Sequence, residues 1–389
     1  MNAATVIDLH PGADSAPPAT PPQRAEIWRG VRRVLAIRVD NLGDVLMTSP
    51  ALAAAAASVP GVELTLLGGP GAGALAPHLS MLHDVIEARV PWVRHPQGQT
   101  AEDDLALVAR LAARDFDAAI IFTVCTQSAL PAALLCRMAG IPLRLAHVRE
   151  NPYELLSDWV PESDLRIDSA RHEVRRQLDL VARVGWRTAD ERLRFALREA
   201  DVARVDALLE QDGQLGPLIV LHVGATAASR RWPAERFGAV ADELARRLGA
   251  RIVFTGSASE QALVATARGA MRARSRSLAG ELSLGELGAL LARADLVVTN
   301  NSGPAHLAAA VGTPVVDLYA LTNPQHTPWQ VPARVLNHPV ACRNCLKSVC
   351  PESHHLCLRG VDIATAVDAA LDLLHPAQPI TLVREARSS

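Results

Sequence analysis

Short apolar runs alternate with helical patterns along most of this 389-residue chain, and this alternation limits the possible folds more than any other feature. In the first half, strands are expected at 34–39, 63–67, 84–88, 118–122 and 143–146. Helices are expected at 44–58, 101–114, 127–139, 171–184 and about 199–212. Strands that alternate with helices in this way predict a parallel sheet covered by helices.

The alternation restarts after Gly216-Pro217. Further strands are expected at 218–222, 251–255, 295–299 and 314–319, and further helices at 233–248, 258–271, 283–292, 303–311 and 361–375. Two consecutive α/β units indicate two Rossmann-like lobes that face each other across a cleft. We therefore predict a disordered tail over 1–29, a first lobe over 30–195 and a second lobe over 196–389.

The composition is that of an ordinary globular protein, with 49% hydrophobic residues, 21% charged residues and a net charge of −2. This near-neutral balance argues against nucleic acid as the main partner. Residues 1–29 are rich in proline, alanine and polar groups and lack the apolar core of a secretory signal. No segment reaches the length of about 18 apolar residues that a membrane span requires. We expect a cytoplasmic protein with, at most, transient contact with the inner membrane.

The segment from Arg33 to Pro50 joins a strand to a helix through the tight turn Asn41-Leu42-Gly43. Asp44 then opens the helix, so it lies at the carboxyl edge of the sheet, where open α/β folds bind ligands. This position suits a catalytic carboxylate. The alternative is structural, because aspartate is favoured in the first turn of any helix.

Three loops of the second lobe end at a common sheet edge and carry groups suited to a nucleotide diphosphate. Glycine and hydroxyl groups leave room and hydrogen bonds for phosphate, arginine binds it in a fork geometry, and a helix start offers free amides. The alternative for the last loop is a well-capped structural helix. The candidate donor-binding residues are Gly224, Thr226, Arg230, Thr255, Gly256, Glu260, Asn301, Ser302, Gly303 and His306.

Four of the six cysteines lie close together, at Cys342, Cys345, Cys350 and Cys357. Four thiolates on a short loop that begins with a Cys-x2-Cys pair suit a tetrahedral structural metal, either zinc or iron. Two disulfides are the alternative, which a reducing compartment disfavours. The remaining two cysteines stand in apolar surroundings and are expected in the core.

Three segments together resemble glycosyltransferase family 9, the ADP-heptose-dependent heptosyltransferases of lipopolysaccharide biosynthesis. They are Gly43-Asp44 with Pro50 six residues after the aspartate, Arg230-Arg231-Trp232-Pro233, and Asn301 to Ala309. The resemblance covers roughly residues 33–375. It implies a GT-B fold, inversion at the sugar, and chemistry without a metal or other cofactor.

The chain departs from the family pattern at two positions. Arg230 stands where lysine is common; Lys347 is the only lysine of the chain, so the positive charge is kept. Asn301 replaces the usual aspartate, which removes a charge near the donor. Thr322–Trp329 and the cysteine cluster resemble one branch of the family, whose autotransporter-modifying members have an iron-binding cysteine motif near the C-terminus.

The resemblance implies that ADP-heptose binds the second lobe and that Asp44 takes the proton from the acceptor hydroxyl. Gly43, Arg144 and Arg149 are the candidate acceptor-binding residues. The acceptor could be a lipid core that contains Kdo or heptose, another surface glycan, or a protein hydroxyl. Two alternatives stay open at this point: a GT-B nucleotide-sugar epimerase or hydrolase, and a catalytically weak binding or assembly protein with a degraded donor site at Asn301.

Overall fold

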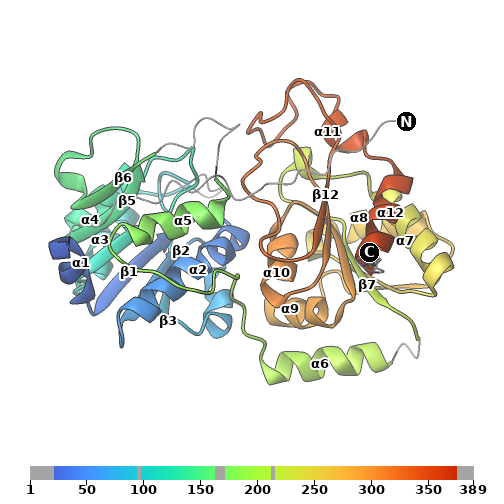
Figure 1. The fold of residues 1–389 in the computed structure, drawn as a ribbon, viewed down its shortest axis with the longest axis horizontal. Helices are drawn as coiled ribbons and strands as arrows, with labels where there is room; N and C mark the ends of the chain where they lie inside the picture. Colours follow the sequence, from blue (N-terminus) through green and yellow to red (C-terminus); the bar gives the residue numbers. More distant parts are fainter. Residues whose placement is uncertain (1–21, 94–97, 163–170, 212–214, 375–389) are drawn as a thin grey trace, which may run out of the picture.

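A computed structural model describes residues 22–93, 98–162, 171–211 and 215–374. Two lobes lie side by side, each built on one six-stranded parallel sheet with helices packed on its faces, and helix α6 (Glu199–Glu210) joins them along one side (Figure 1). The predicted pair of α/β lobes with a GT-B arrangement is confirmed.

The first sheet has the strand order β3-β2-β1-β4-β5-β6. Its strands are β1 (Arg33–Arg38), β2 (Glu63–Gly68), β3 (Leu82–Glu87), β4 (Ala118–Ile121), β5 (Leu143–Val148) and β6 (Asp158–Pro161). Its helices are α1 (Pro22–Arg29), α2 (Leu42–Ser58), α3 (Ala101–Ala112), α4 (Leu130–Met138) and α5 (Glu173–Ala182), with short 3-10 turns η1 (Ala72–His78) and η2 (Tyr153–Leu155). The chain first adds β2 and β3 on one side of β1 and then returns to add β4, β5 and β6 on the other side. Open α/β folds bind ligands at such a switch point, at the carboxyl ends of the strands.

The second sheet repeats this topology, because its order read from the other edge is β9-β8-β7-β10-β11-β12. Its strands are β7 (Leu218–His222), β8 (Arg251–Thr255), β9 (Ser275–Ser277), β10 (Leu296–Asn300), β11 (Val315–Leu318) and β12 (Ala333–Leu336). Its helices are α7 (Ala234–Leu248), α8 (Gln261–Gly269), α9 (Leu284–Arg293), α10 (Gly303–Val311), α11 (Leu356–Arg359) and α12 (Ile363–Leu374), with turns η4 (Ala228–Arg230) and η5 (Ala258–Glu260). The final helix α12 packs on α7 and on the second sheet.

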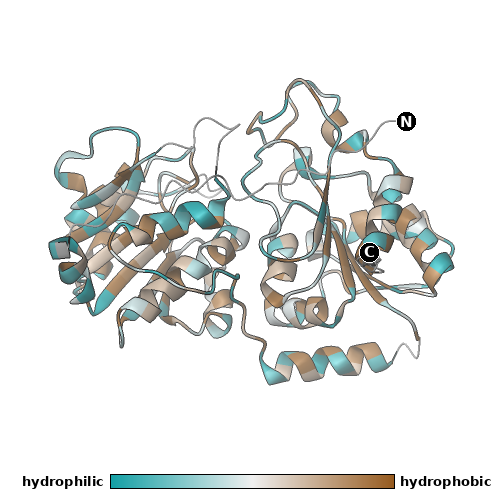
Figure 2. Cartoon of the chain, in the orientation of Figure 1, coloured by the Kyte–Doolittle hydropathy of each residue, from teal (hydrophilic) through white to brown (hydrophobic). Residues whose placement is uncertain are grey.

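The strands are apolar and form the centre of each lobe (Figure 2). One apolar cluster crosses from lobe to lobe: Val45 and Leu46 of α2 share it with Leu307 and Ala308 of α10. Each fully buried side chain of this size stabilises the fold by about 1.5–3 kcal/mol. Burial therefore joins the two lobes at the starts of α2 and α10.

Gly43 allows these two helix starts to come close. A Cβ atom at Gly43 would lie 3.0 Å from Cδ2 of His306 and 3.3 Å from the Cα of Gly303. A side chain at this position would therefore have to displace backbone of the other lobe. The absence of a side chain at Gly43 brings the carboxyl edge of the first sheet against the start of α10.

The predicted disordered tail is wrong for its last eight residues. Pro22–Arg29 forms α1, and its Trp28 is fully buried in an edge-to-face contact with Trp186, 5.4 Å between ring centroids. Arg24 forms an ion pair with Asp158, and the indole Nε1 of Trp28 donates to the same carboxylate at 3.0 Å. The buried side chain of Trp28 and the ion pair of Arg24 hold this helix on the first lobe. The amino-acid composition of residues 1–29 reveals neither contact. Residues 1–21 lie outside the described residues.

Three strands were not expected from the sequence: β6, β9 and β12. All three are edge strands of their sheets, β9 is only three residues long, and none has a long apolar run. Short edge strands are stabilised by one neighbour alone, so their sequences carry a weak pattern.

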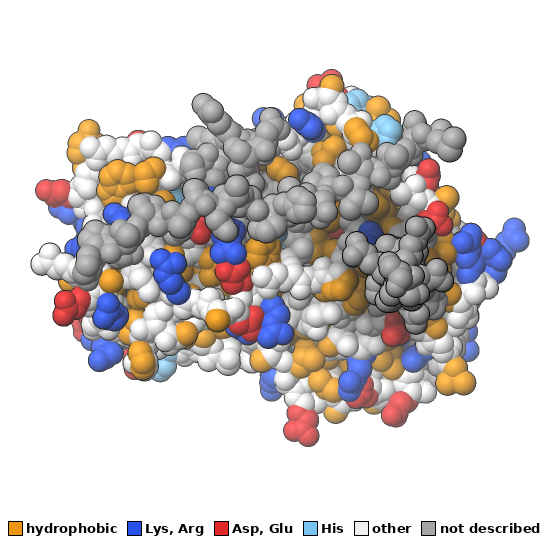
Figure 3. Space-filling view, in the orientation of Figure 1, with side chains coloured by type: hydrophobic (Ala, Val, Ile, Leu, Met, Phe, Trp, Pro, Cys, Tyr) orange, Lys and Arg blue, Asp and Glu red, His pale blue; other side chains and the backbone are white. Residues whose placement is uncertain are grey.

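Within the described segments, no helix has both the length and the apolar character to cross a membrane. On the face drawn in Figure 3, arginines and carboxylates are interspersed.

Candidate active site

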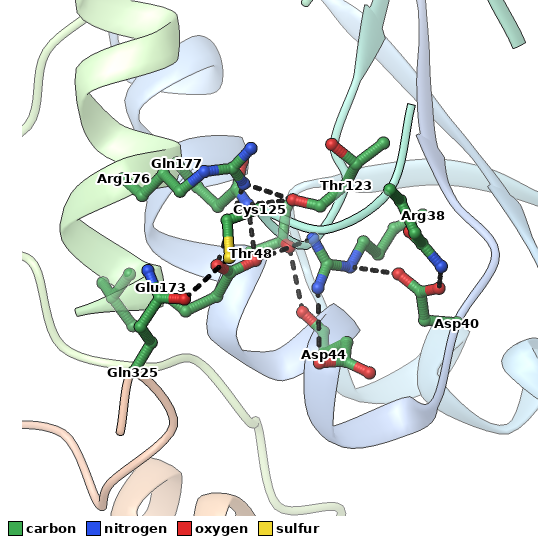
Figure 4. A network of polar contacts seen from close by, with 12 residues as sticks. Arg38, Asp40, Asp44, Thr48, Thr123, Cys125, Glu173, Arg176, Gln177 and Gln325 are labelled. Atoms are coloured by element: carbon green, nitrogen blue, oxygen red, sulfur yellow. Dashed lines mark hydrogen bonds and ion pairs between the residues drawn. The ribbon is translucent and has the colours of Figure 1, made fainter. Parts of the chain in front are cut away.

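A fully buried arginine stands at the carboxyl end of β1 and is surrounded by three carboxylates (Figure 4). The guanidinium of Arg38 lies 3.1 Å from Asp40, 3.2 Å from Asp44 and 3.0 Å from Glu173. A charge removed from water is tolerated only where opposite charges and hydrogen bonds compensate it. These four residues therefore form one buried ionic cluster, and Asp44 belongs to it.

Asp44 lies in the first turn of α2, where its carboxylate accepts a hydrogen bond from the amide of Asn41 at 3.3 Å. Burial by itself would raise the pKa of Asp44, but the charge of Arg38, followed by that of His326, holds it below its usual value. The positive end of the helix also favours an anion here. Asp44 is consequently an ionised carboxylate at neutral pH, and 8% of the residue stays exposed.

Opposite this carboxylate lies the start of α10. Ser302 occupies the N-cap position as expected, yet its hydroxyl donates to the carbonyl of Asn300 at 3.2 Å and makes no bond to a helix amide. The helix start therefore lacks a side-chain cap. Pro304 has no amide hydrogen and the amide of Ala305 donates to the carbonyl of Ser302 at 3.0 Å, so the amide of Gly303 is left for an anion. Asn301 is 5% exposed, and its side-chain oxygen has no hydrogen-bond partner.

His306 projects from the first turns of α10 toward Gly43. The residue is 6% exposed, and its Nδ1 has no hydrogen-bond partner. Burial, reinforced by the charge of His326, lowers the pKa of His306 to about 3, against the opposing effect of Asp44. The imidazole is therefore neutral at physiological pH and available for hydrogen bonding.

Arg230 ends the short turn η4 after β7. Its buried Nε has no hydrogen-bond partner, and its charge lowers the pKa of His306, so the guanidinium reaches the same end of α10. Burial raises the pKa of the nearby Asp317 well above its usual range, an effect that Arg230 opposes. Asn300 fixes this loop, because its side chain accepts from the amide of Trp232 at 2.9 Å and donates to Val223 at 2.9 Å.

A second group of predicted donor residues meets at the ends of β7 and β8. The carboxylate of Glu260 packs directly on Gly224, where an added Cβ would lie 1.9 Å from it. His222 contacts the hydroxyl of Thr255 at 3.1 Å and lies 3.9 Å from Glu260. Gly256 also packs on Glu260. Thr226, by contrast, is exposed in the loop that follows β7.

The two predicted acceptor arginines lie at opposite ends of β5. Arg149 follows the carboxyl end and donates to the carbonyl of Thr126 at 3.2 Å. Arg144 stands near the amino end, where its guanidinium donates to the carbonyls of Pro142, Glu154 and Leu155 among others. The structure therefore does not bring Arg144 to the edge that holds Asp44; Arg144 instead holds the loop before β6.

Sequence reasoning missed four members of the site, which are Arg38, Asp40, Glu173 and His326. The segment 171–184 was predicted only as a helix, yet its residues Glu173, Arg176 and Gln177 are all fully buried. A signal was present, since these residues recur at the spacing of the apolar Leu180 on the same helix face. Charged residues on the apolar face of a helix indicate a buried ionic network.

The four clustered cysteines are free thiols on the long segment between β12 and α12. The sulfur of Cys342 lies 3.7 Å from Nε2 of His354. Burial raises the pKa of Cys357, and the charges of the other three thiols raise it further. Among the residues that the structure describes, no group of three or more possible ligands has the spacing to hold a metal ion.

The same segment supports the donor side of the site. The amides of Asn344 and Leu346 donate to the carbonyls of Leu321 and Thr322, at 2.6 and 2.9 Å. The hydroxyl of Ser229, next to Arg230, donates to the carbonyl of Lys347 at 2.9 Å. The cysteine segment therefore fastens two loops that border the start of α10.

A family model described as glycosyltransferase family 9 (heptosyltransferase) matches residues 105–356, which is more than half of the chain. The chain belongs to glycosyltransferase family 9. This transferase is 27% identical to lipopolysaccharide heptosyltransferase 1 of Pseudomonas aeruginosa over 321 residues, which cover 82% of the chain and 87% of that relative.

Two solved structures share the fold of the transferase. The ADP-heptose lipopolysaccharide heptosyltransferase II of Escherichia coli matches with a TM-score of 0.70 and 22% identity, over 88% of this chain and 99% of the other. The iron-containing dodecameric glycosyltransferase TibC of enterotoxigenic E. coli matches with a TM-score of 0.52 and 15% identity, over 89% of this chain and 76% of TibC. At these identities the likeness concerns the fold.

The lowered pKa of His306 predicts how one residue of the transferase contributes to stability. Between pH 6.5 and about 3 the unfolded chain binds a proton at this histidine that the folded chain does not, so its contribution to stability is lost as pH falls. The loss approaches about 1.4 kcal/mol per pH unit. Between pH 7 and pH 5, His306→Gln should therefore lose about 2 kcal/mol less stability than the wild type. Urea unfolding at both pH values measures this difference, and equal losses would contradict the assignment.

Proposed function

We propose that this transferase moves heptose from ADP-heptose to a sugar hydroxyl of the lipopolysaccharide core, with Asp44 as the general base. One observation carries the proposal: an ionised carboxylate on the first lobe lies against an uncapped helix start on the second, through the contact of Gly43 with Gly303 and His306. The names of the relatives supply the donor and the acceptor class.

On the donor side, the diphosphate would bind the amide of Gly303 at the start of α10 and the guanidinium of Arg230. Both groups are in place before the reaction, and both carry positive charge toward the oxygen that becomes anionic when the sugar leaves. His306 can add a neutral hydrogen bond from the same helix. Glu260, Thr255 and Gly224 meet at the ends of β7 and β8, and we assign the nucleoside to this group.

On the acceptor side, Asp44 would accept the proton of the attacking hydroxyl as the new bond to the anomeric carbon forms and the bond to the diphosphate breaks. Attack from the first lobe and departure toward the second place nucleophile and leaving group on opposite faces of the sugar, which inverts the anomeric centre. Arg38 holds the carboxylate in position and keeps it ionised.

Asn301 bears on donor recognition. Its unpartnered oxygen lies beside the helix start, and its side chain also hydrogen-bonds Tyr319, whose pKa burial raises above its usual range. A neutral amide offers both a donor and an acceptor, where a carboxylate would repel the diphosphate. This substitution is compatible with a working donor site and speaks against a degraded one.

Asp44→Asn should lose transfer while keeping the fold and the donor. The wild type, incubated with ADP-heptose and lipid acceptors ending in Kdo or in heptose, should release ADP and extend one acceptor. The variant should bind ADP with unchanged affinity and turn over about 10²- to 10⁴-fold more slowly, because a general base contributes that much. Exposed Asp103→Asn is the matched control and should be fully active. Near-normal turnover of Asp44→Asn would exclude this residue as the base, and rapid ADP release without acceptor would favour a hydrolase.

We also propose that Cys342, Cys345, Cys350 and Cys357 hold one structural zinc or iron ion. Thiolates are the ligands that these metals prefer, and a first Cys-x2-Cys pair is typical of tetrahedral sites. The mutual effect of the thiols on the pKa of Cys357 and the contact of Cys342 with His354 support such a site. A relative of the same fold is described as iron-containing.

Protein purified without added metal should contain about one zinc or iron per chain by elemental analysis. Cys345→Ser should lose the ion and unfold at lower temperature, because metal affinity contributes to folding. ADP affinity should fall as well, since the segment supports Ser229 beside Arg230. Cys136→Ala, in the core of the first lobe, should keep the ion. A metal-free wild type whose four thiols all react with a thiol reagent would rule the site out.

A further inference from the structure

Glu173, the first residue of α5, is a fully buried carboxylate for which the proposed reaction has no direct use. Arg38 lies 3.0 Å from it, the side chain of Gln177 donates to it at 2.6 Å, and Arg176 lies at 3.7 Å. Burial would raise the pKa of Glu173, but the charges of Arg38 and Arg176 hold it low, so the residue is ionised. Figure 4 shows the carboxylates of Glu173, Asp40 and Asp44 around the guanidinium of Arg38. Glu173 and Asp44 thus share one guanidinium.

The backbone of Glu173 is bound to the other lobe. Its amide donates to the carbonyl of Gln325 at 3.0 Å, on the loop 322–329 that follows β11. The side chain of Gln325 donates to the carbonyl of Arg171 at 2.9 Å and accepts from the thiol of Cys125 at 3.0 Å. His172 contacts the carbonyl of Thr327 at 2.9 Å. Three successive residues before and at the start of α5 therefore hold a loop of the donor lobe.

These contacts form a continuous polar path from one lobe to the base: Gln325, Glu173, Arg38, Asp44. We propose that Glu173 is a positioning residue that keeps Asp44 aimed and basic by competing for the guanidinium of Arg38, and that the docked loop 322–329 holds Glu173 in place. The proposal rests on the role of Asp44 as base.

The physical reason is that Glu173 and Asp44 share the positive charge of one arginine, Arg38. Arg38 is shared by three carboxylates, Asp40, Asp44 and Glu173, and an anion that shares its cation is stabilised less than one that has it alone. Without the charge of Glu173, Asp44 would hold Arg38 more tightly and accept a proton less readily. The other charged or titratable groups that act on the pair stay the same: Arg176 and His172 from α5, His326 from the docked loop, and His306 from α10.

Glu173→Gln removes the charge at constant shape. With ADP-heptose and the acceptor that supports wild-type turnover, kcat should fall about tenfold or more, while KM for ADP-heptose stays within about twofold. The acid limb of kcat/KM should move about one pH unit lower, because the pKa of Asp44 falls. Glu173→Asp, which restores the charge, should bring the acid limb back toward that of the wild type. Gln325→Ala, which loosens the docked loop, should lower kcat in the same way.

A carboxyl-carbon NMR titration of Asp44, assigned with Asp44→Asn, reports the same pKa change without any acceptor. If the wild type transfers no heptose, the proposed function fails and this titration still decides the present inference. Asp158→Asn is the control, because it breaks the ion pair with Arg24, which lies in the same lobe outside the Arg38 cluster, and should lower stability alone. If Glu173→Gln does not fold, Glu173→Asp and Gln325→Ala carry the test. A folded Glu173→Gln whose acid limb and Asp44 titration match the wild type would overturn the inference.

Discussion

The buried guanidinium of Arg38 is the interaction on which the rest of the site depends. It lies at the end of a central strand, where no water can compensate its charge, and three carboxylates from two different segments meet it. Removing one partner would leave the others buried and unbalanced, which costs about 3–5 kcal/mol in proteins. This requirement fixes the start of α2, and with it Asp44, relative to the start of α5.

The second constraint is steric. Both sheets have the same strand order, so each has its switch point, where α/β folds bind ligands, at the carboxyl ends of its strands, and the starts of α2 and α10 pack together. Gly43 lets the helix starts approach until the first turn of α2, which carries the carboxylate of Asp44, lies against Gly303 and His306 of the other lobe. The two lobes contribute opposite charges, and a sugar held between them would have a proton acceptor on one face and a stabilised leaving group on the other.

Much of this arrangement could be predicted from the sequence, and the exceptions have physical causes. The strands and helices near the site follow from periodicity, and Asp44, Gly224, Thr255 and His306 follow from their places after buried strands. The role of Arg38 could not be foreseen, because Glu173, its partner, stands 135 residues away in sequence. Arg144 was misplaced because sequence pattern gives the strand but not the end at which a long side chain is bound. Helix α1 depends on one tryptophan, and a single anchor leaves no periodic pattern.

The most direct test of this account is a crystal structure of Asp44→Asn with intact ADP-heptose. The account predicts the diphosphate on the amide of Gly303 at the start of α10 and beside Arg230, with the anomeric carbon turned toward residue 44 and an open path between them for the acceptor hydroxyl. A diphosphate bound elsewhere, or an anomeric carbon turned away from residue 44, would contradict it.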